Sequence, residues 1–309
     1  MRHVVIHIGA NKTASTTLQR ALFRKHTGLH YMGEDAAGYE SYASLVNSMV
    51  NDDDLYFPSE ECAGLFRRHM GEDVGKTLLY SNEDVMTSRI PMTCARRLND
   101  FLPGAEILLV VRNQYTAIPS FYANHGAFLK PAPPSYFRRH VSFEDWVGFQ
   151  TVFIKYGALA SFMFNRMLSI YADLFGEQRV HVLLFEEFVE NKQQFIEKLS
   201  GILRINSKEA GELLKEGHER KRQTNRMLAY NRFRTRFFWG VRFTDYLPFG
   251  DSIAKRLDKF LSGGGPARIV MSDEIRQVIH DLYCEDNALL AAKYDLPLAK
   301  YGYPIKTLA

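Results

Sequence analysis

The sequence has few of the features that are typical of secreted proteins, of proteins with structural zinc sites or of membrane proteins. It contains three cysteines in 309 residues, and Cys62, Cys94 and Cys284 form no C-x-x-C pair. This argues against a disulfide framework and against a cysteine-based zinc site. No apolar run approaches the ~20 residues of a membrane span, and the amino-terminal apolar stretch is too short for a signal-peptide core. We therefore expect a cytoplasmic protein without a transmembrane segment.

Internal repeats and low-complexity tracts are also missing, which argues against solenoid and disordered architectures. What remains is the composition of an ordinary globular chain, with 46% hydrophobic and 24% charged residues. Such a chain can bury a large core without disulfides. The net charge of +4 suits an anionic ligand but does not require one.

Short β-branched or leucine-rich runs alternate with helical patterns in the first two thirds of the chain. This alternation predicts an α/β fold, a P-loop-like open parallel sheet flanked by helices. The predicted strands are residues 4–8, 77–80, 106–111 and 180–185. The predicted helices of this part are residues 16–26, a helix containing Trp146 capped by Ser142, and residues 155–175 ending at Gly176.

The last hundred residues predict helices at 188–203, 207–217 and 272–293, and no strand. A Gly-Gly-Gly-Pro break at 263–266 precedes the last of them. No long polar linker separates this part from the rest. We interpret the chain as one domain, 1–309, in which residues 206–309 form a mainly helical cap on the α/β core at 1–205. The proline-containing stretch 127–139 is expected to be a surface loop.

The segment between the first strand and the first helix is rich in hydroxyl side chains. The strand ends at Gly9, and the helix starts at about residue 16. Helix amino termini hold phosphate because their N–H groups are unpaired and the helix dipole is positive there. Serine and threonine clusters also cap helices without any ligand, so the loop alone leaves both interpretations open. The candidate phosphate-binding residues are Lys12, Thr13, Ala14, Ser15, Thr16 and Thr17.

A second segment begins where the strand at 106–111 ends. Arg112 follows that strand directly, at the edge where open α/β sheets bind ligands. A helix that starts after Arg112 would return Ser120 toward its guanidinium. The planar fork of arginine suits a phosphate group, although a lone arginine here is equally typical of a surface ion pair.

Together the two segments resemble the nucleotide motifs of PAPS-dependent sulfotransferases, above all bacterial and carbohydrate sulfotransferases. The loop is similar to their 5′-phosphosulfate loop K-[ST]-G-T-T, with Ala14 in place of glycine and Ser15 in place of threonine. The second segment is similar to their 3′-phosphate motif R-N-P-x-x-R-x-x-S-x-Y. Gln114 and Ala117 replace its proline and second arginine, and Pro119 stands inside the expected helix.

The resemblance implies transfer of a sulfuryl group from 3′-phosphoadenosine 5′-phosphosulfate (PAPS) to an acceptor hydroxyl, leaving adenosine 3′,5′-bisphosphate (PAP). It implies that Lys12 stabilises the leaving 5′-phosphate and that Arg112 and Ser120 bind the 3′-phosphate. No metal is needed in such a reaction. The acceptor it favours is a carbohydrate or a glycolipid.

The catalytic base has two candidates. Glu83 follows the predicted strand at 77–80 and matches the glutamate of glycan-modifying sulfotransferases, while His125 follows the second motif and matches the histidine of cytosolic ones. Glu83 could instead make a structural ion pair. Both candidates stay open.

The basic stretch 220–242 interleaves arginines with aromatic residues. It fits a solvated helix whose aromatics dock on the core, with Arg222 reaching the 3′-phosphate or an acidic acceptor. Nucleic-acid binding is not expected, because such a module would not need two nucleotide motifs upstream. The rival functions are a P-loop-type nucleotide or small-molecule kinase and a non-catalytic nucleotide or nucleic-acid binding module. The kinase is disfavoured because the G-K-[ST] signature is missing.

Overall fold

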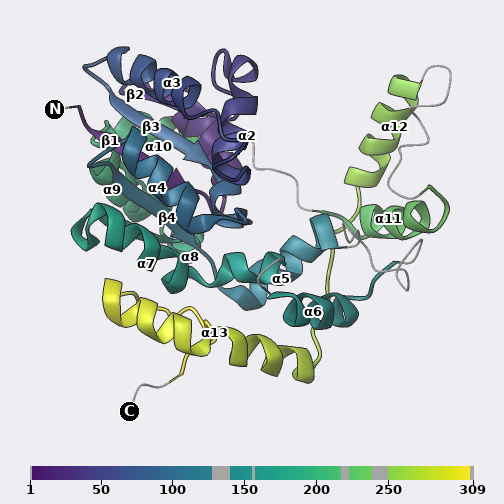
Figure 1. Cartoon of the computed structure of the whole chain (residues 1–309). Coiled ribbons are helices and arrows are strands. Elements are labelled where there is room, and N and C mark those ends of the chain that lie inside the picture. The colour runs from purple at the N-terminus through teal and green to yellow at the C-terminus, as the bar shows by residue number, and fades with distance from the viewer. Residues whose placement is uncertain (1, 127–139, 155–156, 217–222, 239–249, 307–309) are drawn as a thin grey trace.

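The computed structural model describes residues 2–126, 140–154, 157–216, 223–238 and 250–306. Its sheet has the strand order β2-β3-β1-β4-β5, and every neighbouring pair is parallel. Helices cover both faces (Figure 1), which confirms the predicted open α/β sheet. The strands are β1 Val4–Ile8, β2 Leu29–Gly33, β3 Thr77–Asn82, β4 Glu106–Val111 and β5 Val180–Leu184.

Alternate residues of the central strands contribute to two separate hydrophobic cores. Ile6 and Leu109 face a core made with one set of helices. Val5 and Leu108 face a core made with another set. The first set is α2 Ala43–Asn51, α3 Ser59–Gly71, α4 Pro91–Phe101, α7 Phe164–Phe175 and α13 Asp273–Tyr294. The second set is the π-helix η1 Leu18–Phe23, α9 Lys192–Leu203 and α10 Ser207–Glu216. Because both faces are buried, the central strands are mainly apolar, with His7 of β1 and Ser81 of β3 as buried polar exceptions.

The sequence prediction missed β2. This strand pairs only with β3 and forms an edge of the sheet. His30 and Tyr31 within it are only half-buried. Its sequence, LHYMG, has no β-branched residue and ends in glycine, so the signal that identified the other four strands, including the edge strand β5, is weak here.

Several predicted helices are interrupted in the structure. The single helix expected at 16–26 is α1 Ser15–Thr17 followed by η1, and the one expected at 155–175 is a 3₁₀ helix, Ala158–Phe162, followed by α7. The helix expected at 188–203 is divided between α8 Phe185–Glu190 and α9, because Asn191 caps the second piece through Gln194 N–H. Ser142 caps α6 Phe143–Val152 as predicted, and Gly176 ends α7 with φ 96°.

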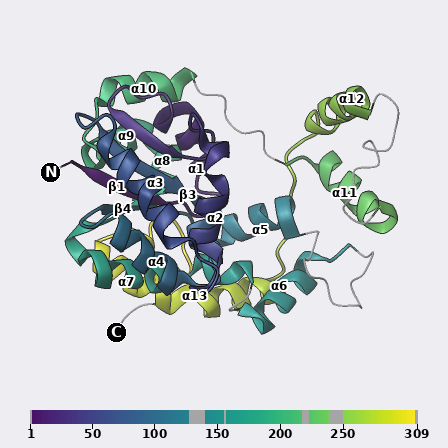
Figure 2. The same cartoon turned by 45° about the horizontal axis from the view of Figure 1, so that its top comes forward.

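Beyond residue 205, the described part of the chain holds helices and one isolated bridge, Thr224 to Pro266, but no strand of the sheet. α10 packs on α9, and α13 packs on α7 and on α5 Gln114–Phe121. In both Figure 1 and Figure 2, α11 Asn225–Phe238 and α12 Gly250–Ser262 lie beside each other and away from the sheet. Among the described residues, no helix combines the length and apolarity that a membrane crossing requires. The stretch 127–139 lies outside the described residues.

A buried pair of side-chain amides joins α5 to α13. Gln114 and Asn287 are both fully buried and exchange two hydrogen bonds of 3.0 Å. Gln114 also donates to the carbonyl of Phe162, and Asn287 donates to that of Pro304. Each amide therefore depends on the other, because a buried amide without a partner is costly.

We expect Asn287→Ala to lower the free energy of unfolding by about 1–3 kcal/mol, since it leaves Gln114 Oε1 buried without its hydrogen-bond donor. Urea unfolding measures this. The matched control is Asn51→Ala at the exposed end of α2, which should change stability by less than about 0.5 kcal/mol. Equal effects of the two substitutions would show that the amide pair contributes little.

Candidate functional site

The carboxyl ends of three neighbouring strands lie side by side and bring several of the predicted site residues together. β1 lies between β3 and β4. Its carboxyl end leads into residues 9–17, which we call the phosphate loop. Glu83 follows β3, and Arg112 follows β4. Open parallel sheets bind ligands at the carboxyl ends of their strands. The candidate site therefore consists of the phosphate loop after β1, Glu83 after β3 and Arg112 after β4.

The phosphate loop has an unusual backbone. Lys12 has φ 67° and Ala14 has φ 66°, a left-handed conformation that costs a residue with a Cβ roughly 1–2 kcal/mol. The hydroxyls of Thr13 and Ser15 lie 2.8 Å and 3.1 Å from the carbonyl oxygen of Ala10 and donate to it. These internal hydrogen bonds offset the strain and fix the loop.

The predicted phosphate-binding residues therefore divide into two groups. Thr13 and Ser15 are buried, and their hydroxyl hydrogens are used within the loop, so toward a ligand they offer backbone N–H groups. Lys12, Thr16 and Thr17 are half-buried, and Thr16 and Thr17 lie in the first turn of α1. The N–H groups at this helix start are the donors that suit an anion.

Arg112 connects the two predicted motifs. Its Nη1 donates to the carbonyl oxygen of Lys12 at 2.9 Å, and its Nε donates to Thr116 Oγ1 at 3.0 Å. Its guanidinium also lies 4.5 Å from the centre of the Phe185 ring, a favourable cation–π geometry. The side chain is thus held in place beside the phosphate loop.

The other residues of the second motif belong to the start and the end of α5. Asn113 caps α5 by accepting from Tyr115 N–H, and its amide donates to the carbonyl of Tyr301 at 2.8 Å. Ser120 is half-buried near the end of α5. Pro119 does not end the helix, which continues to Phe121 and then passes into a π-helical turn, Tyr122–Gly126.

Glu83 reaches the phosphate loop from the β3 side. Asn82 accepts a hydrogen bond from Asp84 N–H at 2.8 Å and so caps the 3₁₀ turn, Glu83–Thr87, that carries Glu83. Thr16 Oγ1 lies 3.5 Å from a carboxylate oxygen of Glu83. A Cβ added to Gly9 would lie 2.8 Å from Glu83 Cγ, so glycine at this position permits the close approach.

Two predicted site residues lie wholly or partly outside the described residues. His125 belongs to the π-helical turn after α5, but its side chain is outside what the structure describes. Arg222 falls within 217–222, which also lies outside the described residues.

A buried polar network beneath the loop was not predicted. His7 Nδ1 lies 2.8 Å from Ser81 Oγ, which also accepts from the amide of Gln19 at 3.0 Å. Burial lowers the pKa of His7 to about 4, so the ring is neutral at pH 7. It packs edge-on against Phe23. The network links β1, β3 and η1, and its members share no sequence motif.

Comparisons with known proteins agree with this architecture. Neither a protein-family model nor a curated protein matches the sequence. A sulfotransferase from Alicyclobacillus acidocaldarius superposes with a TM-score of 0.55, covering 97% of this chain and 99% of its own at 16% identity. The chain has the sulfotransferase fold.

Other sulfotransferase structures also match, with lower scores. The sulfotransferase domain of the curacin biosynthetic pathway has a TM-score of 0.44 at 13% identity, covering 92% of this chain and 98% of its own. A mouse sulfotransferase, SULT7A1 complexed with PAP, has a TM-score of 0.38 at 13% identity, covering 90% and 88%. The Alicyclobacillus structure carries the fold assignment, and identity this low carries no assignment of activity.

We expect the left-handed conformation at Ala14 to make this position sensitive to branching at Cβ. Ala14→Val should destabilise the protein by about 1–3 kcal/mol, because a β-branched residue at positive φ is strained. Ala292→Val, at an exposed position in α13, is the control and should cost only a few tenths of a kcal/mol, on the order of its helix propensity. Thermal or urea unfolding compares the two. An Ala14→Val effect no larger than the control would contradict the assigned loop conformation.

Proposed function

We propose that this protein is a PAPS-dependent sulfotransferase that transfers a sulfuryl group to an acceptor hydroxyl by direct in-line displacement. The observation that carries the proposal is the hydrogen bond from Arg112 to the carbonyl of Lys12. It joins two segments, 100 residues apart, that were separately expected to hold the two ends of one nucleotide. The sulfotransferase fold supports the same conclusion.

In this proposal the phosphate loop holds the 5′ end of the donor. Its helix-start N–H groups, including that of Thr16, and the hydroxyl of Thr17 bind the phosphosulfate oxygens, and the ammonium of Lys12 neutralises the charge that develops on the leaving 5′-phosphate. Arg112 and Ser120 bind the 3′-phosphate, for which the guanidinium fork is well shaped. The preformed loop means that little reorganisation is needed when the donor binds.

Glu83 is our choice for the general base. As the acceptor oxygen forms its bond to sulfur, the sulfur–oxygen bond to the 5′-phosphate breaks, and the acceptor proton passes to the carboxylate of Glu83. Its contact with Thr16 supports this choice. A carboxylate so close to an anion-binding loop is unfavourable for binding alone, so a catalytic role is a reason for its position.

A carbohydrate or glycolipid hydroxyl is the acceptor we propose. This part of the proposal rests on the resemblance to bacterial and carbohydrate sulfotransferases in the two motifs. We also propose that the enzyme acts in the cytoplasm. There Cys62 and Cys94, which are buried and not in a disulfide, would remain reduced.

Calorimetric titration with PAP tests the donor site. The wild type should bind PAP without added metal, with a Kd on the order of 1 μM, or about −8 kcal/mol. Lys12→Ala and Arg112→Ala should each weaken binding about 10- to 100-fold, as expected for the loss of a charge-assisted contact of about 1.5–3 kcal/mol. Arg112→Lys should also weaken it, because an ammonium lacks the planar fork.

Arg20→Ala is the matched control, because Arg20 is exposed and pairs with Asp35 outside the loop. It should leave PAP affinity unchanged. Failure of the folded wild type to bind PAP, or a preference for Mg·ATP, would reject the sulfotransferase assignment and favour a kinase.

Glu83→Gln tests the base. We expect it to retain PAP binding while lowering transfer from labelled PAPS to a carbohydrate acceptor by about 10²- to 10⁴-fold, the usual contribution of a general base. Initial rates on an acceptor found by screening measure this. His125→Ala is the comparison variant and should keep most of the activity. The reverse ranking would transfer the role of base to His125.

A further inference from the structure

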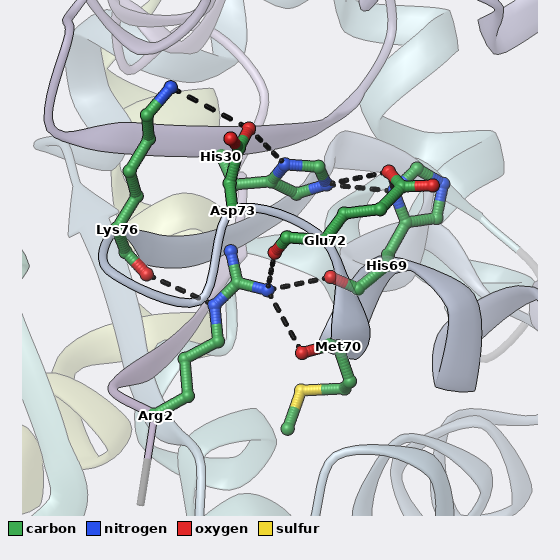
Figure 3. Close-up of polar contacts among 7 residues, drawn as sticks. All are labelled: Arg2, His30, His69, Met70, Glu72, Asp73 and Lys76. Atoms are coloured by element: carbon green, nitrogen blue, oxygen red, sulfur yellow. Dashed lines mark hydrogen bonds and ion pairs between the residues drawn. The ribbon is translucent and has the colours of Figure 1, made fainter.

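The structure brings two histidines and two acidic residues together at a place unrelated to the phosphate loop. His30 lies on the edge strand β2, His69 lies in the last turn of α3, and Glu72 and Asp73 follow that helix. Figure 3 shows these side chains turned toward one another. The sequence indicated no metal site here, because the residues are spread over three elements and form no known spacing motif.

Three ligand atoms of this cluster form a compact triangle. His30 Nε2 lies 2.9 Å from His69 Nδ1 and 3.7 Å from Glu72 Oε2, and the His69 and Glu72 atoms are 3.8 Å apart. In a tetrahedral zinc site with bonds of about 2.0–2.1 Å, ligand atoms lie about 3.3–3.4 Å from one another. Small side-chain rotations would therefore place all three at zinc-binding distance.

The tautomer of His30 also suits a metal. His30 Nδ1 lies 3.0 Å from Asp73 Oδ2, and since an ionised carboxylate only accepts, Nδ1 carries the proton. Nε2 then directs a lone pair into the triangle. A histidine held in this way by a carboxylate is the usual outer-shell arrangement of zinc ligands.

The surroundings keep the cluster in place and partly open. The side chains of His30 and His69 are 12% and 13% exposed, whereas that of Glu72 is 49% exposed, so an ion could enter from the Glu72 side. Arg2 donates to the backbone carbonyls of His69 and Glu72, each at 2.6 Å. Figure 3 shows this guanidinium directed at the turn carbonyls, an arrangement that fixes the backbone carrying the ligands.

We propose that His30, His69 and Glu72 bind a zinc ion, with Asp73 orienting His30 and a water completing the coordination. Two neutral imidazoles and two carboxylates balance the charge of Zn²⁺, and this ligand set suits zinc far better than magnesium or calcium. On binding, the ion takes the place between the two ring nitrogens, and the proton of His69 resides on its other nitrogen.

The proposed ion is separate from the phosphate loop, because it lies near the amino ends of the strands. His30 pairs in register with Leu78, and Leu78 with Val4 at the start of β1. The phosphate loop begins after Ile8, roughly 13 Å farther along the strand at ~3.3 Å per residue. Zinc would tie the edge strand β2 to the end of α3 and to the turn before β3. The inference does not depend on the proposed sulfotransferase activity.

Calorimetric titration of the full chain with Zn²⁺ tests the proposal, using protein without a polyhistidine tag that has been treated with EDTA and dialysed. We expect one equivalent to bind and the melting temperature to rise with Zn²⁺ but not with Mg²⁺. His30→Gln and His69→Gln should abolish both effects. Asp73→Asn should weaken binding about 10- to 100-fold, as outer-shell substitutions do.

His280→Gln is the matched control, because His280 on α13 has a neighbouring carboxylate, Asp281, but belongs to no such cluster within the described part of the chain. It should bind zinc like the wild type. Glu72→Gln guards against misfolding of the histidine variants, since Glu72 is an exposed turn residue: its metal-free melting temperature should equal that of the wild type while its zinc affinity falls.

Two results would overturn the proposal: no zinc binding by the folded wild type, or equal affinity in wild type, His30→Gln, His69→Gln and Glu72→Gln. Titration with PAP on the same samples separates this question from the donor site. PAP affinity should be the same with and without zinc, so loss of PAP binding alone would reject only the proposed activity.

Discussion

The hydrogen bond from Arg112 to the carbonyl of Lys12 is the contact on which the candidate site depends. It exists because β1 and β4 are parallel neighbours, so their carboxyl ends meet at the same edge. The loop after β1 and the arginine after β4 are therefore brought together by strand pairing. The same pairing of β1 with β3 brings Glu83 to the other side of the loop.

The phosphate loop combines a strained backbone with hydrogen bonds that support it. Two left-handed residues, Lys12 and Ala14, cost free energy that flexible loops avoid. The hydroxyls of Thr13 and Ser15 and the guanidinium of Arg112 hold the strained backbone through the carbonyls of Ala10 and Lys12. Part of what resembles a set of phosphate ligands in the sequence is thus the support of the loop itself, and the N–H groups at the start of α1 are the donors that suit an anion.

The sequence was most informative where burial is most complete. β1 and β4 lie in the middle of the sheet and contribute apolar residues to both cores, so their runs predict strands and, through the order of the motifs, the end of the sheet that carries the site. β2 has no β-branched residue and an interrupted apolar run, so it was missed, whereas the other edge strand, β5, contains two valines and was predicted. The interruption between α8 and α9 was missed because apolar residues recur at helical spacing on both sides of Asn191, although Asn191 follows the first helix and caps the second.

Contacts between polar residues far apart in the sequence could not be predicted, because neither residue of such a pair belongs to a motif in its own segment. Gln114 departs from the proline of the sulfotransferase motif, and only the structure relates it to Asn287, 173 positions later. The amide that replaces proline thereby fastens the second motif to the carboxyl-terminal helix. His30 and His69 are 39 positions apart and meet only because β2 lies beside the turn between α3 and β3. The two ends of the same parallel sheet thus carry different chemistry. At the carboxyl ends of the strands, a helix start offers N–H groups that suit an anion. At the amino ends, imidazoles and carboxylates suit a cation.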